Sequence, residues 1–166
     1  DLAHMRDEVW AGLDDDPPHL SPKWFYDTRG SELFEEITRL PEYYPTRTER
    51  ELLERWGAEW IAGERPGTLV ELGAGSARKT RILLDAMQEA RPGALYVPLD
   101  VAEEFLEETA RSLRAEYPEL DIVPEVVDLT RPLELSARLR HPAVFALLGG
   151  TLGNFAPPAA HRLLSH

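Results

Sequence analysis

Two glycines and a carboxylate carry the clearest chemical signal in this sequence. Gly73 and Gly75 follow an apolar run at residues 68–72 and precede a helical pattern, and Asp100 ends the next apolar run. Glycine at such a turn lets the backbone bend sharply and approach a ligand that a Cβ would displace. A strand, a glycine turn and a helix start in this order are typical of a site for a nucleotide-like cofactor.

The spacing of the glycines distinguishes between cofactors. A dinucleotide fingerprint has a third glycine or an alanine at position 78, where this chain has Arg78. The pattern Glu71-x-Gly73-x-Gly75 with a downstream Asp100 instead resembles the S-adenosylmethionine (SAM) motif of class I methyltransferases. In that motif a carboxylate after the second strand accepts the ribose hydroxyls. The alternative interpretation is an ordinary tight turn between a strand and a helix.

The elements that would position these residues alternate from residue 68 onward. Short runs of β-branched and aliphatic residues predict strands at residues 68–72, 95–99, 122–127 and 143–148. Helical stripes follow at residues 78–90, with Ser76 as the expected cap, and at residues 102–117, while residues 133–139 and 157–164 give weaker helical patterns. Strand, helix and strand in alternation predict an α/β fold with a Rossmann-like parallel sheet.

The first 63 residues predict a different organisation, made of helices. Apolar residues at helical spacing indicate a helix over residues 1–13, and Ser31 can cap a second helix that extends to about Leu40. Thr46 and Glu49 have the spacing of a capping box, which predicts a third helix from Thr46. We therefore expect a helical N-terminal segment at residues 1–63 and a cofactor-binding Rossmann-like domain at residues 64–166.

Composition excludes several classes of function. The chain has 166 residues and a net charge of −12, so a nucleic-acid backbone would be repelled and is not expected as a partner. The sequence contains no cysteine, which suits a cytoplasmic protein, and its histidines lack the spacing of metal ligands. No apolar run approaches the roughly 18 to 20 residues that a membrane span requires, so no membrane contact is expected.

Three longer stretches resemble one enzyme family. They lie at residues 22–34, 37–47 and 148–154, and they resemble the histidine Nα-methyltransferases of ergothioneine biosynthesis. The resemblance implies a class I SAM-dependent methyltransferase that transfers three methyl groups to the α-amino nitrogen of L-histidine and forms hercynine. It also implies a separate substrate domain, built from the N-terminal helices and a C-terminal segment.

The resemblance implies a cofactor site as well, made from Gly73, Lys79, Asp100, Asp128 and Leu129. Gly73 would admit the methionine moiety to the turn, and Asp100 could accept two ribose hydroxyls through charge-assisted hydrogen bonds. Asp128 would accept the adenine amino group while Leu129 packs on the ring. Lys79 would meet the cofactor carboxylate or make a further hydrogen bond, and the alternative is an ordinary surface lysine.

The same resemblance implies a substrate site, at Tyr26, Phe34, Tyr43, Gly149, Thr151 and Asn154. Asn154 and Tyr26 would be the catalytic residues. The Asn154 amide can accept from an amine and donate to a carboxylate, so it could hold the zwitterionic end of an amino acid. Tyr43 would face the imidazole, and Tyr26 would lie near the reacting amine. An asparagine after a glycine loop can alternatively cap a following helix.

The fourth predicted strand, residues 143–148, is fully apolar. In the family arrangement it lies inside the sheet, and as an edge it would be prone to unwanted pairing. We therefore expect a C-terminal remainder of the enzyme or a second chain to complete the sheet. Two alternatives remain open, namely that the substrate is another aromatic amino acid such as tryptophan, or that the chain is a noncatalytic fragment that needs a partner.

Overall fold

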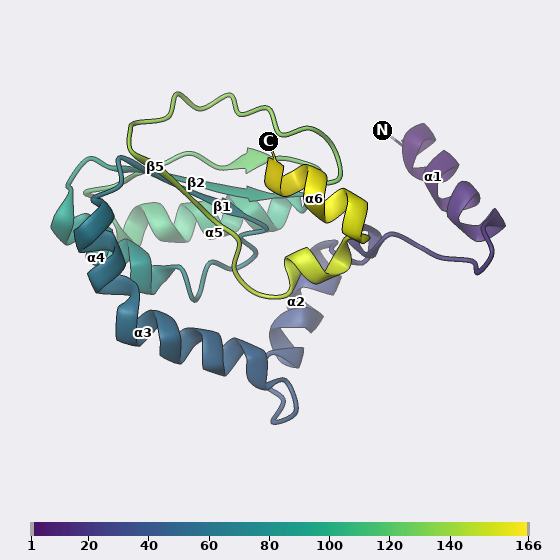
Figure 1. The fold of residues 1–166 in the computed structure, drawn as a ribbon, viewed down its shortest axis with the longest axis horizontal. Coiled ribbons are helices and arrows are strands. Elements are labelled where there is room, and N and C mark those ends of the chain that lie inside the picture. Colours follow the sequence, from purple (N-terminus) through teal and green to yellow (C-terminus); the bar gives the residue numbers. More distant parts are fainter. Residues whose placement is uncertain (1, 166) are drawn as a thin grey trace.

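A parallel sheet forms the centre of the molecule (Figure 1). The computed structural model describes residues 2–165, so Asp1 and His166, the first a predicted helix residue, lie outside the described residues. The strands are ordered β3-β2-β1-β5, with β4 also paired to β2, and every pair is parallel. The predicted α/β fold with a Rossmann-like sheet is therefore confirmed. The strands are β1 (Thr68–Leu72), β2 (Leu95–Asp100), β3 (Asp121–Ile122), β4 (Glu125–Val126) and β5 (Ala143–Ala146).

The two faces of the sheet are covered differently. Leu69 and Tyr96 point to one face and pack against α3 (Tyr44–Glu64), α4 (Arg81–Ala90) and α5 (Glu103–Glu116). Val70 and Val97 point to the other face, which an irregular segment and α6 (Pro157–Ser165) cover (Figure 1). Both faces of β1 are thus removed from water, and all five of its residues, including Thr68 and Glu71, are buried.

The order of the strands places a crevice beside β1. The chain passes from β1 to β2 on one side, through α4, and later returns to pair β5 with the other side of β1. Ligands of open α/β sheets bind at such a switch point, outside the carboxyl ends of the strands. The loops that begin at Gly73 and after β5 both leave the sheet at this point.

Two of the N-terminal helices, α2 and α3, begin earlier than predicted. α1 (Leu2–Asp14) and the short helix η1 (Pro22–Phe25) precede α2 (Thr28–Ile37). Asp27, rather than Ser31, caps α2, because its side chain accepts the Gly30 N–H at 2.7 Å. Ser31 instead lies buried inside the helix. The expectation that Ser31 starts this helix was therefore wrong.

The predicted capping box at the start of α3 was also wrong. The helix begins at Tyr44, with Tyr43 at the N-cap and Pro45 in the first turn. Proline is favoured there because it has no backbone N–H to leave unpaired. Thr46 therefore already lies within the helix, and Glu49 is free to bond outside it.

Two predicted elements in the second half of the sheet differ from the structure. The strand expected at residues 122–127 is divided into β3 and β4, because Pro124 has no N–H for the ladder. The helix expected at residues 133–139 is absent, since 130–142 are irregular. Apolar residues recur there at every second position, which suits an extended segment with one buried side. That segment packs on the sheet through Leu133, Leu135, Ala137 and Leu139.

The last part of the chain follows the prediction more closely. α6 occupies the region in which a helix was expected, while β5 is two residues shorter than predicted. Within the described residues β5 pairs with β1 alone, and its Phe145 is 53% exposed. Among residues 2–165, no helix is both long enough and apolar enough to cross a membrane.

Candidate functional site

A cavity of about 310 Å³ lies at the carboxyl ends of the strands, between the sheet loops and the N-terminal segment. It brings together ten of the eleven residues that the resemblance assigned to a site. Asp128 does not line it, although Val127, Leu129 and Thr130 on either side do. The predicted residues in its wall are Tyr26, Phe34, Tyr43, Gly73, Lys79, Asp100, Leu129, Gly149, Thr151 and Asn154.

The glycine turn is held in place by β2. The N–H groups of Gly73 and Ala74 both donate to the Leu99 carbonyl, each at 2.9 Å. Gly73 has a φ of +77° and Gly75 a φ of +52°, in the left-handed region that favours glycine. A Cβ on Gly73 would lie 3.0 Å from Thr151 Oγ1, so a side chain there would press on the opposite loop.

Asp100 closes the turn from the end of β2. Its Oδ2 accepts the Gly75 N–H at 2.9 Å, and its Oδ1 accepts the N–H groups of Val101 at 2.8 Å and Ala102 at 3.1 Å. A carboxylate offers about four acceptor positions, so these three bonds leave it with acceptor capacity toward the cavity. Asp100 therefore connects the glycine turn to the start of α5.

A buried carboxyl group lies behind the turn. Glu71 is 3% exposed, and it accepts the Thr80 hydroxyl at 2.6 Å and the Tyr96 hydroxyl at a short distance. Burial raises the pKa of Glu71 to about 7, although the hydrogen bonds from Thr80 and Tyr96 act in the opposite direction. The same burial, with the neighbouring Glu71 charge, raises the pKa of Tyr96. This group was part of the predicted motif, but the sequence assigned it no role.

Lys79 belongs to a bridge that the sequence did not reveal. The Glu49 carboxylate binds the Lys79 ammonium at a short distance through one oxygen and accepts the Gly149 N–H at 2.7 Å through the other. The Lys79 side chain is 19% exposed, so it is not an ordinary surface lysine. Glu49 thus joins α3, the helix start after β1 and the loop after β5. A carboxylate 100 residues before its partner gives no local signal.

A second missed carboxylate joins α2 to the glycine turn. Glu35 accepts the Ser76 hydroxyl at a short distance, and its other oxygen lies 3.1 Å from Arg78 Nε. Ser76 therefore does not cap α4, whose N-cap position is Thr80. Because Glu35 follows Phe34 in the chain, this contact holds α2 against the loop after β1.

Three aromatic rings line the N-terminal side of the cavity. Tyr26 and Phe34 meet edge to face with centroids 5.9 Å apart, and Phe34 meets Tyr43 in the same way at 5.9 Å. Arg47 holds the loop that presents Tyr43, because its guanidinium donates to the carbonyls of Leu40 at 2.8 Å and Pro41 at 2.5 Å. The chain thus provides an aromatic wall with a fixed geometry.

Asn154 lies across the cavity from this wall, in the short helix η2 (Thr151–Asn154). Ala156, rather than Asn154, immediately precedes α6 at Pro157. The alternative interpretation of Asn154 as the cap of that helix is therefore wrong. Asn154 lines the cavity together with Gly149 and Thr151.

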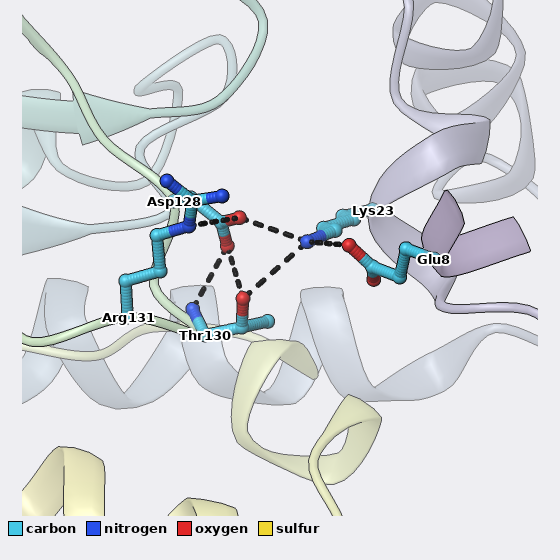
Figure 2. Close-up of polar contacts among 5 residues, drawn as sticks. All are labelled: Glu8, Lys23, Asp128, Thr130 and Arg131. Carbon is cyan, nitrogen blue, oxygen red and sulfur yellow. Dashed lines mark hydrogen bonds and ion pairs between the residues drawn. The ribbon is translucent and has the colours of Figure 1, made fainter. Parts of the chain in front are cut away.

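Asp128 lies at the edge of the cavity in a small polar cluster, and its bonding partners Lys23 and Thr130 both line the cavity (Figure 2). Its Oδ2 accepts from Lys23 Nζ at 2.8 Å, and its Oδ1 accepts the Thr130 N–H at 2.9 Å and the Thr130 hydroxyl at 2.6 Å. Burial acts to raise the pKa of Asp128, but the bonds from Lys23 and Thr130 outweigh it and lower the pKa. The sequence had not suggested Lys23 as a partner.

The described part of the chain contains no group of side chains arranged as a metal site. Among residues 2–165, no three or more histidine, aspartate or glutamate side chains are grouped so that they could hold a metal ion. The polar groups of the cavity instead suit an organic ligand with a hydroxyl-bearing part and a charged part.

Comparison with known proteins assigns the family. Residues 5–166 match the family model described as histidine-specific, SAM-dependent methyltransferases. The chain belongs to this family. The resemblance predicted from the three sequence stretches is confirmed, and with it the dependence of the family on SAM.

Curated relatives agree with this assignment. The histidine N-alpha-methyltransferase of Mycolicibacterium smegmatis is 45% identical over 97% of this chain, which covers 50% of that protein. The protein of the same name from Mycobacterium tuberculosis is 45% identical over 99% of this chain, which covers 52% of it. The chain therefore spans about half the length of the curated relatives it matches.

A solved structure supports the fold. The crystal structure of a DUF574 family protein from Streptomyces avermitilis has a TM-score of 0.56 to this chain at 19% identity. The similarity covers 83% of this chain and 57% of that one. This likeness agrees with the Rossmann-like α/β fold expected from the sequence.

The Glu71 carboxyl group should make stability depend on pH. Its pKa rises from 4.5 to about 7 on folding, so the folded state binds more protons between these values. The stabilisation is complete below about pH 4.5 and is lost as the pH rises through about 7, with a total of at most about 3 kcal/mol. Glu71→Gln is neutral at every pH and should flatten this decline in urea unfolding measured between about pH 5 and pH 8.

Glu51→Gln is the matched control, since Glu51 is an exposed residue on α3. This control should keep the slope of the unmodified chain. An unchanged slope in Glu71→Gln would show that another group causes the pH dependence.

Proposed function

We propose that this chain provides the SAM site and part of the amino-acid site of an L-histidine Nα-methyltransferase, which forms hercynine in ergothioneine biosynthesis. One observation carries the proposal. In a chain of the histidine-specific family, a single cavity joins the glycine turn after β1 to an aromatic wall and to Asn154. The names of the mycobacterial relatives point to the same reaction.

The residues around the glycine turn fit SAM. The turn brings backbone to the cavity without a Cβ at Gly73, and Asp100 retains about one acceptor position for a ribose hydroxyl. Leu129 lines the cavity as an apolar surface for a purine ring, and Lys79 offers a cation for the carboxylate of the methionine moiety. When bound, SAM supplies a methyl group already activated by its sulfonium.

The substrate residues then have one main task, which is alignment. A methyl transfer needs the nitrogen lone pair in line with the methyl carbon and the sulfur, and positioning of this kind contributes a large part of many rate enhancements. Asn154 would hold the amino and carboxylate groups of histidine, with Gly149 and Thr151 shaping the loop around them. Tyr26 would lie beside the reacting amine.

The aromatic wall suits the product as well as the substrate. Positive charge becomes permanent on the nitrogen as methyl groups accumulate, and aromatic ring faces accommodate quaternary ammonium groups. Tyr26, Phe34 and Tyr43 supply such rings at one side of the cavity, and Tyr43 would also face the imidazole. The same site could therefore hold each methylated intermediate.

We propose a division of labour along the chain. Residues 1–63 would contribute to the substrate site, and residues 64–166 would form the cofactor domain. Further chain would complete the sheet beside β5, either as a C-terminal segment or as a second chain. The greater length of the relatives and the exposure of Phe145 support this view. A cytoplasmic location stays a prediction.

The family description favours histidine over another aromatic amino acid such as tryptophan. Isothermal titration of the intact enzyme with histidine in the presence of S-adenosylhomocysteine tests this choice. We expect saturable histidine binding and weaker binding of tryptophan. Absence of histidine binding while S-adenosylhomocysteine binds would contradict the substrate, and a mass-gain assay over an amino-acid panel would then identify the correct one.

Asp100→Ala should weaken SAM binding. Loss of a charged acceptor costs about 1 to 3 kcal/mol, which corresponds to roughly a 5- to 150-fold rise in Kd. The Gly75 N–H also loses its partner, so the turn itself should loosen. Asp121→Ala, at the amino end of β3, is the control and should leave cofactor affinity unchanged. Unaltered affinity in Asp100→Ala would refute this placement of the ribose.

Asn154→Ala should weaken the binding of histidine and spare the binding of the cofactor, the reverse of Asp100→Ala. Asn154 lines the amino-acid side of the cavity, so histidine affinity should fall about tenfold or more while the affinity for S-adenosylhomocysteine is kept. Titration of both ligands into the same preparation measures the two effects together. An equal loss for both ligands would indicate a distorted loop, and it would contradict a specific role in binding the amino acid.

A further inference from the structure

A lysine of the N-terminal segment reaches the far end of the cofactor domain. Lys23 lies in η1 and meets Asp128, which follows β4 at a separation of 105 residues. Figure 2 shows the Lys23 ammonium between Asp128 on one side and Glu8 of α1 on the other. Lys23 also lines the cavity described above.

The Lys23 ammonium is fully engaged. It lies 2.8 Å from Asp128 Oδ2, 2.8 Å from Glu8 Oε2 and 3.4 Å from Thr130 Oγ1. These three acceptors match its three protons. Its side chain is only 10% exposed, so the ion pair with Asp128 is screened less by water than a surface pair would be.

Lys23 affects both the charge and the orientation of the Asp128 carboxylate. Burial acts to lower the pKa of Lys23, but its bonds to Asp128 and Glu8 raise the pKa overall, so the ammonium stays charged. Thr130 occupies Oδ1 with two hydrogen bonds, while Lys23 occupies one side of Oδ2. The acceptor capacity that remains on Oδ2 is therefore fixed in direction by Lys23.

We infer that Lys23 is a positioning residue of the cofactor site, which holds the Asp128 carboxylate so that it can accept the exocyclic amino group of the adenine ring. The inference rests on the proposed function, because it takes the ligand to be SAM or its product. Its consequence is that the N-terminal segment contributes to cofactor affinity in addition to its contribution to the amino-acid site.

The structure offers a matched control for this role. Arg131 is a second cation at the same carboxylate, with Nε 3.7 Å from Asp128 Oδ2, but its side chain is 57% exposed. Lys23→Met and Arg131→Met each remove one positive charge near Asp128, so a general change in charge would affect both alike. Glu8→Gln leaves the bond between Lys23 and Asp128 in place.

The experiment is isothermal titration of S-adenosylhomocysteine into the unmodified chain and these variants. Lys23→Met should raise the Kd about tenfold or more, since it removes a charged hydrogen bond. Arg131→Met should stay within about twofold, because the Arg131 side chain is 57% exposed and such pairs contribute little. Glu8→Gln should also stay within about twofold, because it leaves the 2.8 Å bond between Lys23 and Asp128 in place. Lys23→Arg should restore most of the affinity, and histidine affinity at saturating S-adenosylhomocysteine should be unchanged in Lys23→Met.

A pH series adds a readout that a purely structural role would not move. The charged groups facing Asp128 are Lys23 and Arg131, with Glu8 beyond Lys23. Without the ammonium, Asp128 should take up a proton at higher pH, so the acid-side loss of affinity should begin at higher pH in Lys23→Met. In Arg131→Met it should begin where it does in the unmodified chain.

Three results would overturn the inference. These are unchanged or tighter binding by Lys23→Met, equal losses in Lys23→Met and Arg131→Met, and a failure of Lys23→Arg to restore affinity. If circular dichroism shows that Lys23→Met is unfolded, Lys23→Gln replaces it under the same criterion. An unmodified chain that binds no S-adenosylhomocysteine would refute the cofactor assignment and this inference with it. Cofactor binding without histidine binding would refute only the proposed substrate.

Discussion

The hydrogen bonds between the turn after β1 and the end of β2 are the constraint on which the rest of the site depends. Gly73 and Ala74 donate to the Leu99 carbonyl, and Gly75 donates to the Asp100 side chain. Because β2 is itself buried on both faces, the turn cannot shift without disturbing the core. The cofactor end of the cavity is therefore formed before any ligand arrives.

The N-terminal segment is attached to this rigid part mainly through charged contacts. Glu35 meets Ser76 and Arg78 near the turn, Glu49 joins Lys79 to the loop after β5, and Lys23 meets Asp128 at the edge of the cavity. Several of these side chains are largely buried, so their contacts are screened less than pairs on an open surface. The aromatic rings of the substrate side are thereby held at a defined distance from the cofactor turn.

In the proposed function, this arrangement would let one cavity hold both a cofactor and an amino acid. The sheet contributes backbone groups and a carboxylate, which suit a nucleoside, while the helices contribute rings and the loop after β5 contributes an amide. Neither set is complete alone, because the reacting nitrogen must meet the methyl group between them. A cavity that joins these two sets of groups suits the SAM-dependent methyl transfer by which the family is described.

Much of the fold and of the site followed from local pattern. Apolar runs identified the strands, and the glycine spacing identified the turn. The family resemblance pointed to Tyr43 and Asn154, which line one cavity, while their role in binding a substrate stays a prediction. Local pattern works here because a strand or a tight turn is determined by neighbouring residues. The helix expected at residues 133–139 was wrong, because the apolar residues there follow a two-residue period. The caps expected at Ser31 and Thr46 were wrong, because Asp27 and Pro45 give the stronger local signals at those helix starts.

The sequence by itself thus determined the parallel sheet, the cofactor turn and the family to which the chain belongs. Only the tertiary structure decided which charged residues connect the two parts, namely Lys23, Glu35 and Glu49. Their partners in the second part of the chain lie 30 to 107 residues away. An acidic or basic side chain on a helix surface has the same local signature whether it faces water or another element. The pairing depends on the packing of distant segments, which no short stretch of sequence encodes.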